Sequence, residues 1–356
     1  MKTFYHIIIA GGSGSRFWPK SRKNKPKQLL KILNNKTMIR LTFERINKFA
    51  KSKYIMVIAS KELCKKIQAE IPEIPKENFI IEPSGKNTAP AIGLAAMHVL
   101  KKNENSLMAI YPSDHLIEGD DEFQNTIHGA EKLIEKKSCL ITIGVKPTYP
   151  ATGYGYIHHD KPDNDSKGCK VLNFTEKPSL KKANKFISNG NYLWNAGIFA
   201  WKTKTLLKEI KKYMPDLYKH LFLIHNSILT KNYEQTLNTQ WQSIHAESID
   251  YGILEKSKEI YTLESNFRWN DLGSWKSLFD ILSKNKDQNH LEGDVISIQS
   301  NNNLVISPNR LTAIIGIKDI AIINLNDATL IVPHEKAEDV KDVVKMLQSL
   351  NNDKYL

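Results

Sequence analysis

Short, wholly apolar runs alternate with amphipathic stretches through the N-terminal part of the chain. Such runs are typical of strands buried inside a sheet, whereas apolar residues spaced three and four apart indicate helices with one buried face. The predicted strands cover residues 7–9, 54–59, 79–81 and 106–111, and the predicted helices cover residues 37–49, 61–70, 89–101 and 122–136. This alternation predicts an α/β fold with a mostly parallel sheet, right-handed crossovers and a ligand crevice at the carboxyl ends of the strands.

The pattern changes after residue 147. Segments 152–157 and 171–178 predict antiparallel strands with polar turns between them, and residues 203–240 predict helices. Beyond a polar linker at 285–290, short β segments recur at 294–298, 304–306, 311–315, 321–325 and 329–332, which suggests a small parallel β-helix, with a β-sandwich as the alternative. Residues 335–350 predict an amphipathic helix that either closes this β domain or pairs with a second copy of the chain in a homodimer. We therefore expect two domains, residues 1–284 and 290–356.

The composition fits a globular protein and narrows its partners. Of the 356 residues, 41% are hydrophobic, enough for a large α/β domain and a small second one. The net charge is +13, but the lysines are scattered and form no stripe interleaved with aromatic residues, so we expect a solvated basic surface and no nucleic-acid partner. The three cysteines are far apart and indicate buried thiols, not a disulfide framework or a zinc site. With neither a signal peptide nor a membrane-spanning run, we predict a cytoplasmic protein with no membrane partner.

A glycine-rich segment follows the first strand. Gly11, Gly12 and Gly14 expose backbone N–H groups to a ligand, because no Cβ covers them. Arg16 adds a planar guanidinium and Lys27 a compact cation, so the segment predicts phosphate binding in preference to an ordinary glycine turn beside a basic loop. It is neither a Walker A loop nor a dinucleotide fingerprint, because it lacks the Gly-Lys pair of the first and the third small residue of the second.

The segment Gly11–Pro19, with the following Pro26-Lys27-Gln28, resembles the signature of the sugar-nucleotide pyrophosphorylases, Gly-Gly-x-Gly-Thr/Ser-Arg-Leu/Phe-x-Pro and then Pro-Lys-Gln. The resemblance implies a Rossmann-like, GT-A-like nucleotidyltransferase domain with a mixed, mostly parallel sheet, followed by a short left-handed β-helix and a terminal helix. It also implies that Arg16 and Lys27 act on the phosphates, and that the nucleotide is bound by Gly11, Gly12, Gly14 and Ser15.

A second segment, Glu82–Ala91, lies at the end of a predicted strand. Thr88 is expected to cap the following helix and Gly85 to form a turn, which leaves Glu82 and Asn87 to read the edge of a base, since a carboxylate accepts from the N–H donors of guanine. The segment is similar to the Glu-Pro-x-Gly-Arg-Asn-Thr-Ala-Pro-Ala signature of the mannose-1-phosphate guanylyltransferases, with Lys86 in place of the usual Arg. The resemblance implies guanine-nucleotide binding by Glu82, Gly85 and Asn87.

Two acidic residues are candidates for a magnesium site. Asp114 follows the strand 106–111, and Mg²⁺ is commonly held by one or two carboxylates together with substrate phosphates. By itself a turn-forming Asp is the alternative, but the segment matches the family's Pro-Ser-Asp-His. Asp271 matches the family's Trp-x-Asp-x-Gly-x-Trp pattern as the second metal ligand, although Asp271 or Ser274 also suits the start of a helix. His115 is not assigned as a base, because a sugar phosphate is mostly dianionic at neutral pH.

Three further segments match the family and imply a sugar-phosphate site. Glu176 and Lys177 match its Phe-x-Glu-Lys-Pro pattern and combine a carboxylate for sugar hydroxyls with a cation for the phosphate, although a surface Glu-Lys pair is the common alternative. Asn195 matches Trp-Asn-Ser/Ala-Gly-Ile/Met-Phe as a ligand of a sugar hydroxyl, and Gly153 is expected to let the backbone approach the sugar. Asp250 lies in another matching segment, but its spacing assigns it no role.

The resemblance covers nearly the whole chain and implies Mg²⁺-dependent nucleotidyl transfer, in which GTP and mannose 1-phosphate give GDP-mannose and pyrophosphate. A phosphate oxygen of the sugar attacks the α-phosphorus in line, so catalysis rests on positioning and charge neutralisation. Two alternatives remain open. One is a related enzyme that uses dTTP or UTP, or glucose 1-phosphate, and the other is a regulatory paralogue that binds GDP-mannose without turnover.

Overall fold

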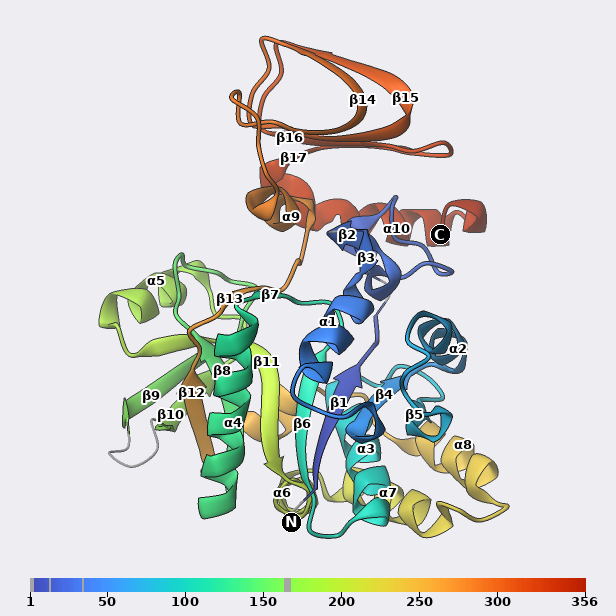
Figure 1. Cartoon of the computed structure of the whole chain (residues 1–356), viewed down its shortest axis with the longest axis vertical. Coiled ribbons are helices and arrows are strands. Elements are labelled where there is room, and N and C mark those ends of the chain that lie inside the picture. Colours follow the sequence, from blue (N-terminus) through green and yellow to red (C-terminus); the bar gives the residue numbers. More distant parts are fainter. Residues whose placement is uncertain (1–2, 13, 34, 163–167) are drawn as a thin grey trace. The chain divides into compact units, whose positions relative to one another are not determined.

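The computed structural model describes residues 3–12, 14–33, 35–162 and 168–356, so Ser13 of the glycine-rich segment lies outside them. The chain forms two compact units, whose elements are labelled in Figure 1. The larger unit comprises Met1–Gly11, Arg40–Ser113 and Ile117–Trp269, and the smaller unit comprises Gly12–Ile39, Asp114–Leu116 and Asn270–Leu356. The smaller unit therefore combines most of the glycine-rich loop with the C-terminal part of the chain.

A nine-stranded mixed sheet lies at the centre of the larger unit. Its strands run in the order β5 (Phe79–Ile81), β4 (Ile55–Ala59), β1 (Phe4–Ile9), β6 (Leu107–Pro112), β11 (Tyr192–Lys202), β8 (Leu140–Val145), β12 (Ile260–Glu264), β10 (Cys169–Thr175) and β9 (Tyr156–Pro162). The strands from β5 to β6 are parallel, whereas β11 is antiparallel to both β6 and β8. The predicted α/β fold with a mixed sheet is thus confirmed.

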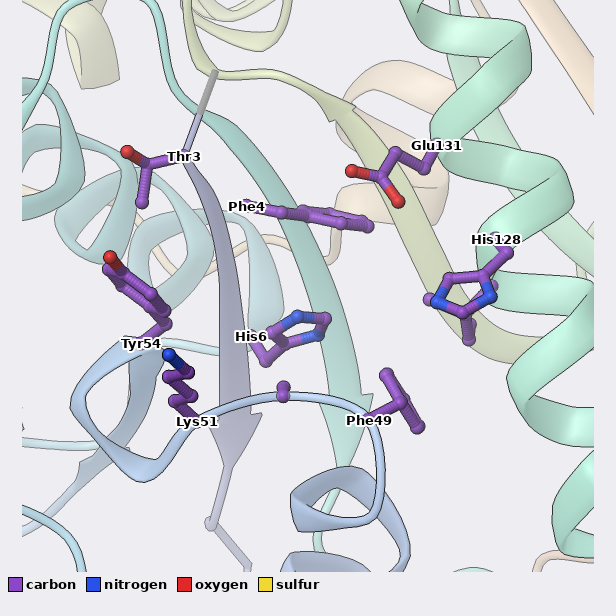
Figure 2. Close-up of a pocket in the computed structure, with 10 residues that line it drawn as sticks. Thr3, Phe4, His6, Phe49, Lys51, Tyr54, His128 and Glu131 are labelled. Atoms are coloured by element: carbon purple, nitrogen blue, oxygen red, sulfur yellow. The ribbon is translucent and has the colours of Figure 1, made fainter. Parts of the chain in front are cut away.

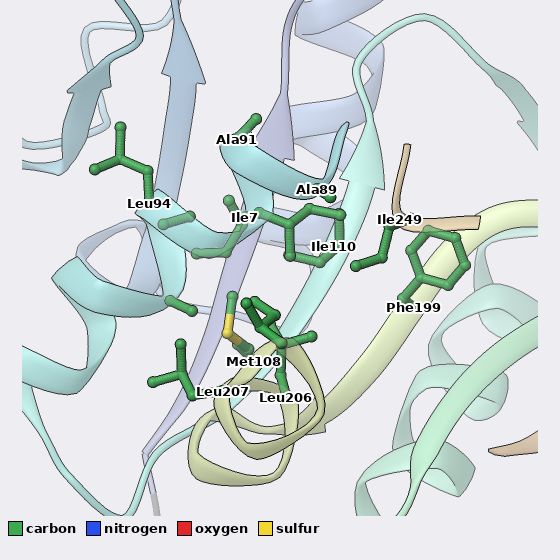
Figure 3. Close-up of a cluster of buried hydrophobic side chains, with 14 of the residues drawn as sticks. Ile7, Ala89, Ala91, Leu94, Met108, Ile110, Phe199, Leu206, Leu207 and Ile249 are labelled. Atoms are coloured by element: carbon green, nitrogen blue, oxygen red, sulfur yellow. The ribbon is translucent and has the colours of Figure 1, made fainter. Parts of the chain in front are cut away.

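The helices that contact strands of this sheet are α2 (Lys61–Glu70), α3 (Thr88–Lys102), α4 (Asp120–Lys136), α5 (Leu180–Asn189) and α6 (Thr203–Tyr213). A second layer consists of α7 (Pro215–Ser227), which packs on α3 and α6, and α8 (Tyr233–Ser243), which packs on α7. Figure 3 shows part of the main core, in which Ile7 and Ile110 of the sheet pack with Leu94 of α3 and Leu206 of α6. All four side chains are fully buried. This packing fixes the carboxyl ends of β1 and β6, after which the predicted site segments follow.

The start of α3 differs from the prediction. Its N-cap is Asn87, whose side-chain oxygen accepts a hydrogen bond of 2.8 Å from the backbone N of Thr88. The expectation that Thr88 caps this helix is therefore wrong. The Thr88 hydroxyl instead accepts a hydrogen bond of 2.8 Å from the backbone N of Ile249. The tertiary fold uses the Thr88 oxygen elsewhere and leaves the cap to its neighbour.

A four-stranded sheet forms the C-terminal part of the smaller unit. Its order is β14 (His290–Ile298), β15 (Leu304–Ile315), β16 (Ile320–Asn324) and β17 (Thr329–Pro333). β14, β15 and β16 pair in parallel, and β17 pairs antiparallel with β16. Val305, Ile314 and Ile322 form a small core, and buried Asn303 donates to the side-chain oxygen of Asn289 at 3.1 Å. Parallel pairing of successive segments favours stacked rungs over a sandwich of antiparallel sheets.

The remaining elements are α1 (Met38–Asn47), β2 (Lys31–Leu33), β3 (Lys36–Thr37), β7 (Leu116–Glu118), β13 (Arg268–Asn270), α9 (Trp275–Ile281) and α10 (Val340–Ser349). Two predicted boundaries are wrong. Segments 304–306 and 311–315 belong to one strand, because the turn residues between them bend β15 and shift its register without ending it. The terminal helix begins at Val340, since His334–Asp339 form a 3-10 helix. None of the helices within the described ranges is long and apolar enough to cross a membrane.

Candidate active site

The glycine-rich loop follows β1 directly. Gly12 and Gly14 have φ angles of 79° and 62°, a region that favours glycine. A Cβ on Gly14 would lie 2.4 Å from the Cβ of Lys27, so the loop packs against Lys27 only because residue 14 lacks a side chain. Among the described residues, nothing lies within 4 Å of a Cβ built on Gly11 or Gly12. The space that a side chain would fill at these two residues is therefore empty.

The smaller unit brings together Lys27, Asp114 and Asp271. Nζ of Lys27 lies 2.9 Å from Oδ2 of Asp114 and donates a hydrogen bond of 2.8 Å to the backbone oxygen of Asp271. Burial alone would raise the pKa of Asp114, but the positive charges of Lys27 and His115 bring it below its usual value. Asp114 is thus a carboxylate at neutral pH, and three segments far apart in the sequence meet at one ammonium group.

Asp271 begins the turn that precedes α9. Its Oδ1 accepts a hydrogen bond of 3.1 Å from the backbone N of Gly273, and a Cβ on Gly273 would lie 2.9 Å from Oδ2 of Asp271. A side chain at residue 273 would therefore require the Asp271 carboxylate to move. The start of α9 is capped by Ser274, in a capping box with Ser277. The capping role that the sequence left open between Asp271 and Ser274 belongs to Ser274.

Asp114 and Asp271 have the chemistry that Mg²⁺ requires. Mg²⁺ prefers oxygen ligands and is usually held by one or two carboxylates, with water and substrate phosphates completing its shell. The Lys27 ammonium contacts the carboxylate of Asp114 and the backbone oxygen of Asp271, so the two residues are close neighbours. In the part of the chain that the structure describes, no group of three or more His, Cys, Asp or Glu side chains offers a site for a metal. A zinc site with four protein ligands has no candidate there.

Arg16 lies in the short 3-10 helix Ser15–Phe17. Its Nε lies 2.6 Å from Oε2 of Glu338, which precedes α10, and the Arg16 side chain is 44% exposed. Sequence reasoning missed Glu338, because no local pattern around it indicates a site. The guanidinium predicted to bind phosphate therefore has a carboxylate partner and remains accessible to a ligand.

The segment predicted to bind the base forms a bonded turn in the larger unit. Oε1 of Glu82 accepts a hydrogen bond of 3.2 Å from the backbone N of Lys86, and burial raises the pKa of Glu82. The Lys86 ammonium donates to the backbone oxygen of Ile244 at 2.8 Å, so this lysine stabilises the turn. No described residue lies within 4 Å of a Cβ built on Gly85. Asn87 is exposed, but its side-chain oxygen caps α3.

Glu176 and Lys177 form an ion pair in the larger unit. Nζ of Lys177 lies 2.5 Å from Oε1 of Glu176, and the Glu176 side chain is 10% exposed whereas that of Lys177 is 59% exposed. Burial would lower the pKa of Lys177, but Glu176 raises it above its usual value. A Cβ on Gly155 would lie 2.5 Å from Oε2 of Glu176, whereas nothing in the described parts of the chain lies within 4 Å at Gly153. A side chain at residue 155 would therefore displace the Glu176 carboxylate, a contact that sequence reasoning missed.

Three partners fix the amide of Asn195. Its Oδ1 accepts from the Thr142 hydroxyl at 2.8 Å and from the backbone N of Gly197 at 3.1 Å, and its Nδ2 donates to Oδ1 of Asp250 at 3.0 Å. Burial and then the charge of Glu176 raise the pKa of Asp250 to about 7. Sequence reasoning missed Thr142, although a hydroxyl inside an otherwise apolar strand was a signal, and it left Asp250 without a role.

The segment 248–250 links the two predicted binding regions of the larger unit. The backbone N of Ile249 donates to the Thr88 hydroxyl, beside Asn87, and the next residue, Asp250, accepts from Asn195.

The predicted site residues are divided between the two units. The larger unit contains Gly11, Glu82, Gly85, Asn87, Gly153, Glu176, Lys177 and Asn195, and the smaller unit contains Gly12, Gly14, Ser15, Arg16, Lys27, Asp114 and Asp271.

Figure 2 shows a cavity elsewhere in the larger unit. It has a volume of about 340 Å³ and surrounds the amino end of β1, where Phe4, His6 and Glu131 are among the residues that line it. None of the predicted site residues lines this cavity. Ligands of open α/β sheets bind at the carboxyl ends of the strands, so the cavity is not the candidate active site.

Known proteins match this chain over nearly its whole length. A family model described as nucleotidyl transferase matches residues 5–288, and one described as a MannoseP isomerase/GMP-like beta-helix domain matches residues 293–347. Mannose-1-phosphate guanylyltransferase 2 of Escherichia coli O157:H7 is 34% identical over 361 residues, with 98% of this chain and 74% of the relative covered. The alginate biosynthesis protein AlgA of Pseudomonas aeruginosa is 33% identical over 351 residues, with 96% of this chain and 72% of the relative covered.

A solved structure from Thermus thermophilus, described as a mannose-1-phosphate geranyltransferase, has a similar fold. Its TM-score is 0.88 at 26% sequence identity, and the match covers 98% of this chain and 100% of that one. The family resemblance that the motifs indicate is thus confirmed by both sequence and fold. The chain is a nucleotidyltransferase with a C-terminal β domain and a terminal helix, and it belongs to the mannose-1-phosphate guanylyltransferase family.

Proposed function

We propose that the chain makes GDP-mannose and pyrophosphate from GTP and mannose 1-phosphate, with a phosphate oxygen of the sugar attacking the α-phosphorus in line. Membership of the family supports the transfer of a guanylyl group. The observation that carries the site assignment is the contact of Lys27 with the carboxylate of Asp114 and with the backbone oxygen of Asp271. The protein needs no nucleophile of its own, because a sugar phosphate is already mostly dianionic at neutral pH.

In this proposal Asp114 and Asp271 hold Mg²⁺. When bound, Mg²⁺ neutralises phosphate charge and orients the reacting phosphate. Lys27 can neutralise either Asp114 or a phosphate oxygen, and Arg16 binds the triphosphate through its planar guanidinium. The backbone N–H groups of the loop bind further phosphate oxygens, at Gly11, Gly12, Gly14 and Ser15.

The larger unit recognises the base and the sugar phosphate. Glu82 accepts from the N–H donors of guanine, with Gly85 and Asn87 completing the nucleotide-binding segment. Lys177 neutralises the phosphate of the sugar, and Glu176, Asn195 and Gly153 contact the sugar itself. The partners of Asn195 support this role, because they fix which end of its amide is oxygen and which is nitrogen.

Product formation tests the proposal. The protein is incubated with GTP, dTTP or UTP and with mannose 1-phosphate or glucose 1-phosphate, with and without Mg²⁺, and pyrophosphate release is measured. We expect release with GTP and mannose 1-phosphate, and only in the presence of Mg²⁺. Faster release with another nucleotide or with glucose 1-phosphate would favour a related pyrophosphorylase. Binding of GDP-mannose without release under any condition would favour a regulatory paralogue.

The proposal also covers the domain architecture, the cellular compartment and the oligomeric state. We infer a Rossmann-like, GT-A-like domain over residues 1–284 and a left-handed β-helix domain over residues 290–356, and the parallel pairing of β14, β15 and β16 supports the latter. Three free, buried cysteines support a reducing, cytoplasmic setting. Exposed Val343, Met346 and Leu350 at α10 and its C-terminal end support a homodimer, which sedimentation would test.

A further inference from the structure

Four ion pairs join the loop after Gly14 to the C-terminal part of the smaller unit. They are Arg16–Glu338 at 2.6 Å, Lys20–Glu292 at 3.7 Å, Arg22–Asp327 at 3.0 Å and Lys23–Asp353 at 2.9 Å. The 3-10 helix Ser15–Phe17 also contacts α10. Basic residues that follow the glycines are thus paired, one by one, with acidic residues far along the chain.

Hydrogen bonds and ring packing also hold the same loop. The backbone oxygen of Tyr355 accepts from Nε1 of Trp18 at 2.8 Å and from Nη1 of Arg22 at 2.7 Å. Nε1 of Trp275 donates to the backbone oxygen of Trp18 at 3.0 Å, and its buried ring lies 5.0 Å from the ring of Phe17. The position of the loop therefore depends on residues beyond 270.

Among these contacts, the Arg16–Glu338 pair holds the group that we assign to the triphosphate. Glu338 approaches Nε of Arg16, and a guanidinium has two further nitrogens that can bind phosphate oxygens side by side. The two side chains are 44% and 56% exposed, so the pair contributes little to the stability of the fold. Its effect should instead appear in ligand binding, because a long, exposed arginine loses less conformational freedom on binding when a partner already restrains it.

We propose that Glu338 is a positioning residue for the nucleotide, which restrains Arg16 so that its remaining nitrogens meet the triphosphate. This inference rests on the proposed role of Arg16. The alternative is competition, in which the Glu338 carboxylate and the triphosphate bind the same Arg16 guanidinium and Glu338 weakens the binding of GTP. The sign of the change in KM for GTP separates the two.

Steady-state kinetics of four variants test the proposal. Glu338→Ala is expected to raise KM for GTP about fivefold, the effect of losing one exposed ion pair, without changing KM for mannose 1-phosphate or the Tm. Asp353→Ala removes another exposed pair to the same loop and is expected to leave both KM values unchanged. The double variant Arg16→Ala/Glu338→Ala is expected to match Arg16→Ala, because Glu338 acts only through Arg16.

Ionic strength provides a further readout that a merely structural role would not change. The difference between Glu338→Ala and wild type should shrink as salt screens the exposed pair. A lower KM for GTP in Glu338→Ala would overturn the proposal in favour of competition. The proposal would also be overturned if Arg16→Ala raises KM for GTP while Glu338→Ala leaves it unchanged. If Arg16→Ala itself leaves KM for GTP unchanged, the phosphate role of Arg16 fails and the role of Glu338 falls with it.

Discussion

At the scale of single residues, Asp114 is the residue whose substitution we expect to lower kcat most. Lys27 keeps this carboxylate ionised despite burial, and ionised oxygen is what Mg²⁺ binds. We predict that Asp114→Asn lowers kcat by at least about 100-fold, because the neutral amide binds the ion poorly and charge at the reacting phosphate goes uncompensated. Pyrophosphate release at saturating substrates, measured across a range of Mg²⁺ concentrations, checks this. A retained kcat with the same Mg²⁺ dependence would contradict the metal assignment.

Lys177→Ala is the matched control for this prediction. It also removes one charge from the proposed site, but from the group assigned to the sugar phosphate. KM for mannose 1-phosphate should therefore rise, with the Mg²⁺ dependence unchanged. Wild-type kinetics in both variants would refute both assignments.

Asp250 gives a prediction about pH. Burial and then the charge of Glu176 raise its pKa from 3.8 to about 7. Between these values the folded chain holds a proton that the unfolded chain lacks, so the contribution of this group to stability falls as pH rises and is lowest above about pH 7. Asp250→Asn keeps an oxygen for Nδ2 of Asn195 but cannot ionise. We predict that the Tm of this variant, relative to that of wild type, is higher at about pH 8 than at about pH 5. An equal difference at both pH values would mean that Asp250 titrates normally.

At the scale of elements, the start of α3 combines a helix cap with a strained backbone. Asn87 has φ 69° and ψ −172°, and its side-chain oxygen accepts from the backbone N of Thr88 at 2.8 Å. We predict that Asn87→Ala lowers the free energy of unfolding by about 1 to 2 kcal/mol, because it loses the cap and keeps the strain. Asn87→Gly should stay close to wild type, since glycine adopts this conformation freely. Urea unfolding measures both.

The same two variants separate capping from nucleotide binding. If the Asn87 side chain binds the nucleotide, KM for GTP rises in both variants, including the stable Asn87→Gly. We expect this result. A normal KM in Asn87→Gly would leave Asn87 with a structural role only.

The sequence predicts a helix or strand where one periodic pattern dominates. It predicts the end of that element where only one nearby residue can cap or terminate it. α2 covers the predicted range Lys61–Glu70. The cap of α3 was misassigned because Asn and Thr both cap well, and only a distant partner, Ile249, decides between them. The turn residues inside β15 predicted a break, whereas pairing with β14 carries the strand through it.

The candidate site divides in the same way. Family motifs indicate Lys27, Asp114 and Asp271, although not that one ammonium group joins them. Thr142 and Asp250 contact Asn195, and Glu338 contacts Arg16, from segments distant in the sequence. The hydroxyl in an apolar strand marks Thr142 as unusual, but no local pattern names the partner of any of the three. A family resemblance therefore indicates candidate site residues more readily than the residues that hold them in place.

At the scale of the whole molecule, the net charge of +13 acts on two anionic substrates. Attraction between dispersed lysines and phosphates reaches only about 8 Å at physiological ionic strength, and further at lower salt. We predict that KM for GTP and for mannose 1-phosphate rises about threefold between about 0.02 M and about 0.3 M NaCl, with kcat nearly constant, because screening slows encounter without changing the bound complex. Sucrose at matched viscosity is the control. KM values independent of salt would mean that the dispersed lysines do not contribute to substrate binding. Duplex DNA should not inhibit at physiological salt, because scattered lysines do not follow a phosphate backbone.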